Sequence, residues 1–157
     1  MPERFFHEDS GKRELERTER LVLGLVDEVE RELELEPRGR YLVGFSQGGY
    51  CGSWVAVRHP EVFDGMVVSG ARVKTEFLGE AMEAAAAAGF RALLCHGSKD
   101  ASVLPSAAER SRDGLAQAGV DVELRWFDAG HSLGRRQGEA IGDWVEDDRS
   151  RREGGAR

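Results

Sequence analysis

Apolar residues recur at helical spacing near the start of the chain. Between Ser10 and Leu35 they form one stripe, with glutamate and arginine at most other positions: Leu15, Val22, Leu25, Val26, Val29 and Leu33. This spacing predicts an amphipathic helix. Pro37 and Gly39 are expected to end it, because the residue before a proline is pushed out of the helical region. A helix of about 25 residues would be roughly 37 Å long, enough to cross a sheet.

Four later stretches have the apolar pattern of strands. Three are short, mostly apolar runs, which are typical of strands buried on both faces of a sheet. The fourth alternates apolar with charged residues, which is typical of a strand with one exposed face. The four stretches are residues 41–45, 66–70, 90–95 and 120–127.

Helical patterns separate these strands and follow the last one. They cover residues 51–57, 77–88, 106–118 and 133–145. Ser106 and Glu109 form a capping-box signature at the start of the third helix, and Gly89 and Gly119 stand where the second and third are expected to end. Strands that alternate with helices predict an α/β fold. We expect a mostly parallel sheet of about four strands, with right-handed crossovers and helices on both faces.

The length of 157 residues fits one domain with a substantial core. We expect a single α/β domain over residues 1–147. Residues 148–157 are charged and rich in glycine at their end, so we expect a disordered tail there.

Composition narrows the classes of partner. Lysine and arginine number 22 and aspartate and glutamate 29, which gives a net charge of −7. An acidic chain without a basic stripe is a poor candidate for binding nucleic acid. The first residues lack the apolar core of a signal peptide, and no apolar run approaches the roughly 20 residues that span a bilayer. Cys51 and Cys95 lie in apolar stretches and are expected to be buried, neither paired nor metal-bound. We therefore expect a cytoplasmic protein.

The strongest chemical signal is the sequence Gly44-Phe45-Ser46-Gln47-Gly48 between the first predicted strand and the helix that follows. Gly-x-Ser-x-Gly at such a junction is typical of a nucleophile elbow, in which a sharp turn exposes the serine oxygen above the sheet. The glycines are needed where strand and helix pass too closely for side chains. The helix N-terminus beneath the serine presents N–H groups that suit a developing oxyanion.

Two more polar residues follow predicted strands. Asp100 comes just after the third strand and His131 just after the fourth. The carboxyl ends of parallel strands meet at one edge of a sheet, so Ser46, Asp100 and His131 are expected there together. The chain order Ser, Asp, His is also the order in which Ser-Asp-His catalytic sites occur on folds where strands alternate with helices.

These three segments resemble the motif series of the α/β-hydrolase superfamily: Gly44-Phe45-Ser46-Gln47-Gly48-Gly49, His96-Gly97-Ser98-Lys99-Asp100 and Ala129-Gly130-His131. The likeness is strongest to the phospholipase/carboxylesterase family, which includes acyl-protein thioesterases, and it covers residues 15–145. The resemblance implies that Ser46 is the nucleophile, His131 its general base and Asp100 the residue that orients His131. The backbone N–H of Gln47 would be one oxyanion donor.

The residues leave one alternative for the acid. Asp128 lies closer to His131 in sequence than Asp100 does, although Asp100 is favoured. We expect no catalytic role for His59 and His96.

The chain departs from the family pattern at its start. Family members begin with further strands, and a loop after an early strand supplies the second oxyanion N–H. Nothing in residues 1–40 has the pattern of that strand or of a glycine-rich loop. We therefore expect a shortened α/β-hydrolase fold whose first strand, residues 41–45, has an unpaired edge that permits a homodimer.

The leading hypothesis is a serine hydrolase that cleaves small-molecule carboxylic esters or thioesters through an acyl-Ser46 intermediate. It would need no metal and no cofactor. The alternatives are a non-catalytic hydrolase remnant or assembly module, or a fragment of a longer hydrolase. The presence of all three triad residue types favours the first hypothesis, because a remnant has no physical need of them.

Overall fold

The computed structural model describes residues 8–155. The chain divides into two compact units, Met1–Pro37 and Arg38–Arg157. In its described part, the first unit forms one helix, α1 (Glu8–Glu32), in the region where the apolar stripe predicts a helix. It ends before Pro37, and Glu34 just beyond it has a φ of 50°. The expectation of one domain over residues 1–147 stays a prediction.

The second unit contains a four-stranded parallel sheet, as predicted. Its strands follow one another in space in the order β1-β2-β3-β4. The elements are β1 (Tyr41–Phe45), α2 (Gln47–Arg58), β2 (Gly65–Ser69), the short 3-10 helix η1 (Thr75–Phe77), α3 (Gly79–Ala87), β3 (Arg91–Gly97), α4 (Pro105–Gln117), β4 (Asp121–Phe127) and α5 (Arg135–Gly155).

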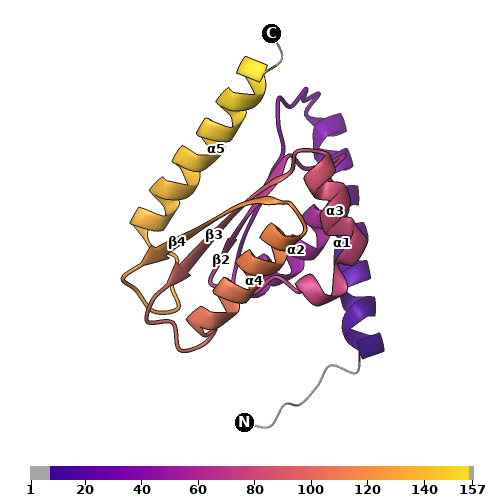
Figure 1. The fold of residues 1–157 in the computed structure, drawn as a ribbon. Coiled ribbons are helices and arrows are strands. Elements are labelled where there is room, and N and C mark those ends of the chain that lie inside the picture. The colour runs from indigo at the N-terminus through magenta and orange to yellow at the C-terminus, as the bar shows by residue number, and fades with distance from the viewer. Residues whose placement is uncertain (1–7, 156–157) are drawn as a thin grey trace. The chain divides into compact units, whose positions relative to one another are not determined.

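Helices lie on both faces of the sheet. Helices α2 and α4 pack against one face, and α5 packs against the other (Figure 1). Strand β2 is buried along its whole length, and so is β3 after its first residue, which agrees with their apolar sequences. A shielded central pair of this kind is expected when both faces of a parallel sheet are covered.

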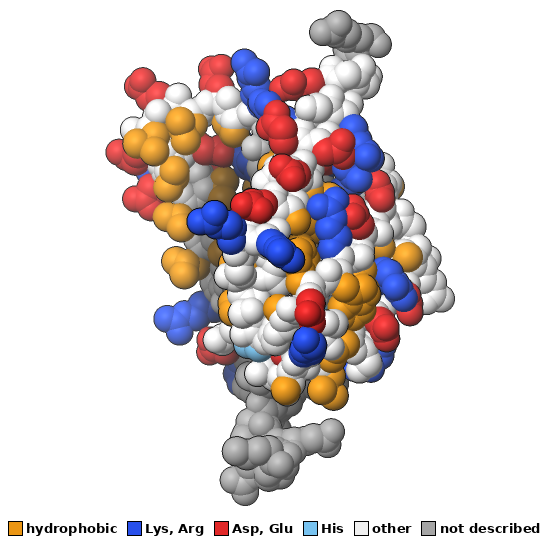
Figure 2. Space-filling model, turned by 90° about the vertical axis from the view of Figure 1, so that its left-hand side faces the viewer, with side chains coloured by type: hydrophobic (Ala, Val, Ile, Leu, Met, Phe, Trp, Pro, Cys, Tyr) orange, Lys and Arg blue, Asp and Glu red, His pale blue; other side chains and the backbone are white. Residues whose placement is uncertain are grey.

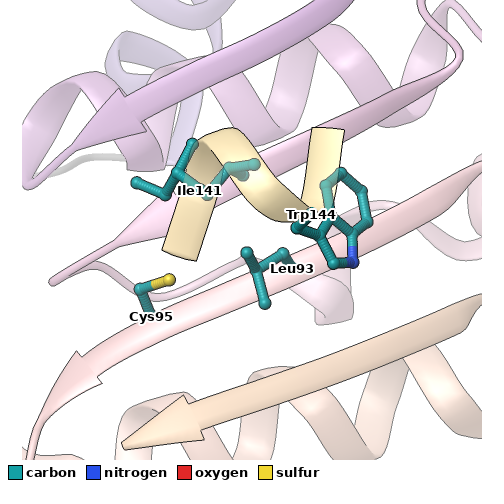
Figure 3. Packing of buried hydrophobic residues seen from close by; sticks show 5 residues of the cluster. Leu93, Cys95, Ile141 and Trp144 are labelled. Atoms are coloured by element: carbon teal, nitrogen blue, oxygen red, sulfur yellow. The ribbon is translucent and has the colours of Figure 1, made fainter. Parts of the chain in front are cut away.

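The core beneath α5 joins that helix to the two central strands. Ile141 and Trp144 of α5 pack against Leu93 and Cys95 of β3 and against Val67 of β2 (Figure 3). Each large apolar side chain buried in this way contributes about 1.5–3 kcal/mol. This contact fixes the orientation of α5 and therefore of the loop that precedes it, which contains His131.

The prediction of a disordered tail is wrong for the described residues 148–155. Helix α5 continues to Gly155, and the Asp148 side chain is only 1% exposed. Tyr41 Oη donates a 2.7 Å hydrogen bond to Asp148, and the guanidinium groups of Arg91 and Arg152 donate bonds of 2.9 and 2.7 Å. The charged composition predicted disorder, but Asp148 is instead bonded to the first residues of β1 and β3. Residues 156–157 lie outside the described part.

Ion pairs also support the outer surface of this segment. They join residues three or four apart on the helix, as in Arg149–Glu146 at 2.5 Å and Arg151–Asp147 at 2.9 Å. Figure 2 shows this side of the molecule, where acidic and basic side chains are interspersed. Exposed pairs of this kind are each worth only about 0.3–0.5 kcal/mol, so the buried Asp148 network is the main anchor.

Candidate active site

The junction between β1 and α2 is a strained turn centred on Ser46. Ser46 has a φ of 53° and a ψ of −124°, an uncommon conformation for a residue with a side chain. Such strain costs about 1–3 kcal/mol and persists only where the surrounding structure enforces it. Here the Ser46 N–H donates to the Ser69 carbonyl of β2 at 2.9 Å, and the Ser46 carbonyl accepts from the Tyr50 N–H at 3.0 Å.

The glycines of the elbow are required by close backbone contact. A Cβ on Gly44 would lie 2.4 Å from the Gly48 carbonyl oxygen, and one on Gly49 would lie 2.8 Å from the Gly44 carbonyl oxygen. Both distances are shorter than real Cβ contacts. Strand and helix therefore meet as the motif predicts, and the Ser46 hydroxyl does not cap α2.

The Ser46 hydroxyl meets His131 instead. His131 Nε2 lies 2.9 Å from Ser46 Oγ, and His131 Nδ1 lies 2.8 Å from Asp100 Oδ2. A carboxylate only accepts hydrogen bonds, so we assign the proton to Nδ1 and leave the Nε2 lone pair to accept from the serine hydroxyl. The structure thus brings the three predicted residues into one hydrogen-bonded chain, within the distances that proton transfer requires.

Asp100 is held as an anion although its side chain is buried. Burial alone would raise the pKa of Asp100, but hydrogen bonds from the Val103 N–H, from His131 and from the Ser102 N–H together lower that pKa below its usual value. The two backbone bonds both measure 2.9 Å and reach Oδ1, which leaves Oδ2 for His131. The carboxylate is therefore charged and fixed in orientation at neutral pH.

Asp128, the alternative acid, faces elsewhere. Its carboxylate pairs with Lys99 Nζ at 2.6 Å, and its side chain is 81% exposed. The hydrogen bond from Lys99 lowers the pKa of Asp128. Asp100 is therefore the carboxylate that contacts His131.

Two neighbours of His131 were not anticipated from the sequence. The Phe45 ring lies against the imidazole, with centroids 5.0 Å apart and a tilt of 36°. Gly70 lies on the same ring: its φ is +58°, and a Cβ there would be 3.4 Å from His131 Nδ1 and 2.9 Å from the Phe45 ring. A positive φ favours glycine at any position. Only the folded structure shows that Gly70 also leaves room for the rings of Phe45 and His131.

The remaining described histidines lie outside the hydrogen-bonded chain. His59 follows the end of α2, at the far end of that helix from Ser46, and its Nδ1 is 2.8 Å from Glu61. His96 is buried beside Asp100, with Nε2 2.8 Å from the Val103 carbonyl.

The N-terminus of α2 points its free N–H groups toward the Ser46 side of the sheet. Gln47 is the first residue of the helix, and the first turn contains no acidic side chain to oppose an anion. In the described part of the chain, no group of three or more His, Cys, Asp or Glu side chains is arranged to hold a metal ion. Nor is any helix of that part long and apolar enough to cross a membrane.

Comparison with known proteins agrees with this architecture. The dienelactone hydrolase family model matches residues 9–153. No curated protein is a significant match in sequence. A Bacillus cereus carboxylesterase structure is 18% identical with a TM-score of 0.72, and the match covers 94% of this chain and 66% of that one. Zea mays acyl-protein thioesterase 2 is 22% identical with a TM-score of 0.66, covering 78% and 62% of the two chains. A Mesorhizobium loti carboxylesterase is 16% identical with a TM-score of 0.67, covering 84% and 61%.

The chain therefore spans slightly less than two thirds of the length of these three structures. Matches of such low identity establish a shared fold only. At the level of the fold, they confirm the expected likeness to carboxylesterases and to an acyl-protein thioesterase. The family model covers nearly the whole chain and is more specific. The chain belongs to the dienelactone hydrolase family, within the α/β-hydrolase superfamily.

Proposed function

We propose that this chain is a serine hydrolase that cleaves small-molecule carboxylic esters or thioesters through an acyl-Ser46 intermediate. The observation that supports this most is the continuous chain of hydrogen bonds from Ser46 through His131 to Asp100, with heavy-atom distances of 2.9 and 2.8 Å. The strained elbow adds support, because it holds the hydroxyl away from the helix it would otherwise cap. Family membership favours hydrolysis over other reactions.

In this mechanism His131 removes the proton of the Ser46 hydroxyl as that oxygen attacks the acyl carbon. A neutral hydroxyl is a poor nucleophile near neutral pH, so the base must already be within hydrogen-bonding distance. Asp100 orients the imidazole and stabilises the imidazolium that forms. The lowered pKa of Asp100 suits this role, because the carboxylate stays charged throughout.

The protonated His131 then donates its proton to the leaving alkoxide or thiolate. This leaves the acyl group on Ser46 and a neutral imidazole. Water attacks the acyl-enzyme with His131 as base, which releases the carboxylic acid and restores the serine. The Gln47 N–H at the start of α2 is our candidate for binding the oxyanion in both steps, aided by the dipole of that helix.

A fluorophosphonate probe tests the nucleophile directly, because it reacts with an activated serine. We expect the wild-type chain to be labelled at Ser46 and to hydrolyse a short acyl ester. Ser46→Ala should lose both properties while its circular dichroism is unchanged. Ser98→Ala is the matched control, because Ser98 lies in the exposed loop after β3 and its hydroxyl donates to the Phe127 carbonyl at 3.1 Å. Equal labelling of wild type and Ser46→Ala would refute the assignment.

Labelling also separates this proposal from one alternative, because a folded chain that is not labelled would favour a non-catalytic remnant or assembly module. Slow turnover of a labelled chain would agree both with the single oxyanion donor assigned here and with a fragment of a longer hydrolase whose remaining part supplies a further donor.

A further inference from the structure

His96 is a buried titratable side chain that the mechanism above does not use. It lies near the end of β3, is 1% exposed and contacts the Trp126 ring of β4 edge to face, with centroids 6.0 Å apart. Its Nε2 is 2.8 Å from the Val103 carbonyl oxygen and 3.6 Å from Asp100 Oδ2. A second imidazole therefore lies against the same carboxylate that binds His131.

The proton on His96 can be assigned from its partner. A carbonyl oxygen only accepts hydrogen bonds, so His96 Nε2 must bear the proton and donate it to Val103. The 3.6 Å separation from Asp100 Oδ2 is too long for a hydrogen bond. The N–H of His96 therefore acts on Asp100 mainly through the segment that it holds.

That segment is the turn from Asp100 to Val103. Asp100 Oδ1 accepts hydrogen bonds from the Ser102 and Val103 N–H groups, each of 2.9 Å. The Val103 residue is thus bonded on both sides: its N–H binds Asp100 and its carbonyl binds His96. The Asp100 end of this turn is held to β3 by the Asp100 N–H, which donates to the Gly97 carbonyl at 3.1 Å, and His96 ties the Val103 end to the same buried central strand.

We propose that His96 is a positioning residue for the hydrolytic site. By holding the Val103 carbonyl it fixes the plane of the Asp100 carboxylate, so that Oδ2 points at His131 Nδ1. This inference rests on the proposed function and assigns an additional residue to it. Small displacements of a catalytic group cost up to about 10²-fold in rate. A buried residue that holds Asp100 in place should therefore affect the rate of hydrolysis.

Two substitutions separate the hydrogen bond from the packing. His96→Gln keeps an N–H donor at about the same distance from the backbone, whereas His96→Phe keeps an aromatic ring against Trp126 and removes the donor. We expect kcat per phosphonate-titrated site to fall about 10–100-fold in His96→Phe, with KM within about threefold of wild type. His96→Gln should recover most of this loss.

The pH profile provides a readout that a purely structural role would not change. A misaligned Asp100 stabilises the His131 imidazolium less, so His131 should lose its proton more readily. The acid limb of kcat/KM should therefore move to lower pH in His96→Phe and stay near its wild-type position in His96→Gln. An unchanged limb with unchanged kcat per titrated site would overturn the inference, and so would equal losses in both variants.

A proton spectrum keeps this test separate from the proposed function. The His131 Nδ1 proton bonded to Asp100 should give a far-downfield signal, assigned by its loss in Asp100→Asn. We expect that signal to weaken or shift upfield in His96→Phe, whether or not the chain turns over esters. If the wild type is not labelled, the proposed function fails and the signal still tests the positioning. An unaltered signal in folded His96→Phe would refute the proposal that His96 is a positioning residue.

Discussion

Replacement of Asp148 by asparagine tests the anchor of α5. Asp148 is 1% exposed and accepts hydrogen bonds from Tyr41, Arg91 and Arg152. Asp148→Asn keeps the shape but removes the charge that faces two guanidinium groups. Loss of one partner from a buried ion pair costs about 3–5 kcal/mol. The expected cost is lower here, about 2–4 kcal/mol, because each arginine keeps a second carboxylate near it.

The second carboxylate beside each arginine limits the loss of stability in Asp148→Asn. Arg91 keeps Asp121 at 2.7 Å, and Arg152 keeps Asp64 at 3.5 Å. The Arg152 side chain is also 30% exposed, so water offsets part of the lost charge. A loss of about 2–4 kcal/mol corresponds to a fall in melting temperature of roughly 10 °C for a chain of this size.

Urea unfolding followed by tryptophan fluorescence measures this change, because Trp144 lies in the core beneath α5. Asp147→Asn is the matched control: its carboxylate is 51% exposed, pairs on the surface with Arg151 at 2.9 Å and lies 3.9 Å from Arg91, so its removal should cost less than about 0.5 kcal/mol. Labelling of Ser46 should be the same in both variants, because Asp148 bonds to the first residues of β1 and β3 and Ser46 follows the opposite end of β1.

Acid should abolish the difference between wild type and Asp148→Asn. Burial alone would raise the pKa of Asp148, but the bonds from Arg152, Arg91 and Tyr41 lower it overall. A carboxyl whose pKa is lower in the folded state stabilises the fold above its unfolded pKa of about 3.9 and loses this effect as the pH falls through the folded value. Equal unfolding free energies for Asp148→Asn and Asp147→Asn at pH 7 would refute the reasoning.

Three further predictions concern the site and the sheet edge. Gly70→Ala should destabilise the fold by about 1–2 kcal/mol because the φ of Gly70 is +58°, and should lower kcat about tenfold or more because the added Cβ displaces His131. A variant with wild-type kcat and stability would contradict this. Asp100→Asn should reduce kcat by about 10³–10⁴-fold and Asp128→Asn by less than threefold, and the reverse order in ester hydrolysis would overturn the choice of acid. We also propose that β1, which pairs with β2 on one side, permits a homodimer through its other edge; light scattering should show a dimer that Val43→Lys weakens, and a monomeric wild type would exclude it.

The fold and the convergence of Ser46, Asp100 and His131 could be predicted because their signals are local. Apolar runs and helical spacing locate strands and helices, and the carboxyl ends of parallel strands meet at one edge wherever the chain folds this way. Ser46, Asp100 and His131 each follow such an end directly, so their convergence required no knowledge of side-chain contacts.

The features that were missed depend on contacts between distant residues. Asp148 bonds to Tyr41 across 107 positions, and a window of charged sequence contains no sign of that partner. The fit of Gly70 beneath His131 likewise requires the approach of two separate loops. His96 was expected to have no catalytic role, and its Nε2 bonds to the Val103 carbonyl rather than to Ser46 or His131; its proposed effect arises only through the backbone of Val103.

Labelling and turnover, measured on one preparation, provide the sharpest test of the claim that His131 and Asp100 activate Ser46. We expect the 157-residue chain to react with a fluorophosphonate at Ser46, and His131→Gln to react at least about 100-fold more slowly. The Gln47 N–H is the one oxyanion donor in this mechanism, and loss of one donor of a pair costs about 10²–10³ in turnover. Ester hydrolysis should therefore be slower than the usual enzyme range of about 1–10³ per second. Turnover within that range would show that a second donor exists, whereas no labelling of the folded wild type, or equal labelling of His131→Gln, would contradict the claim.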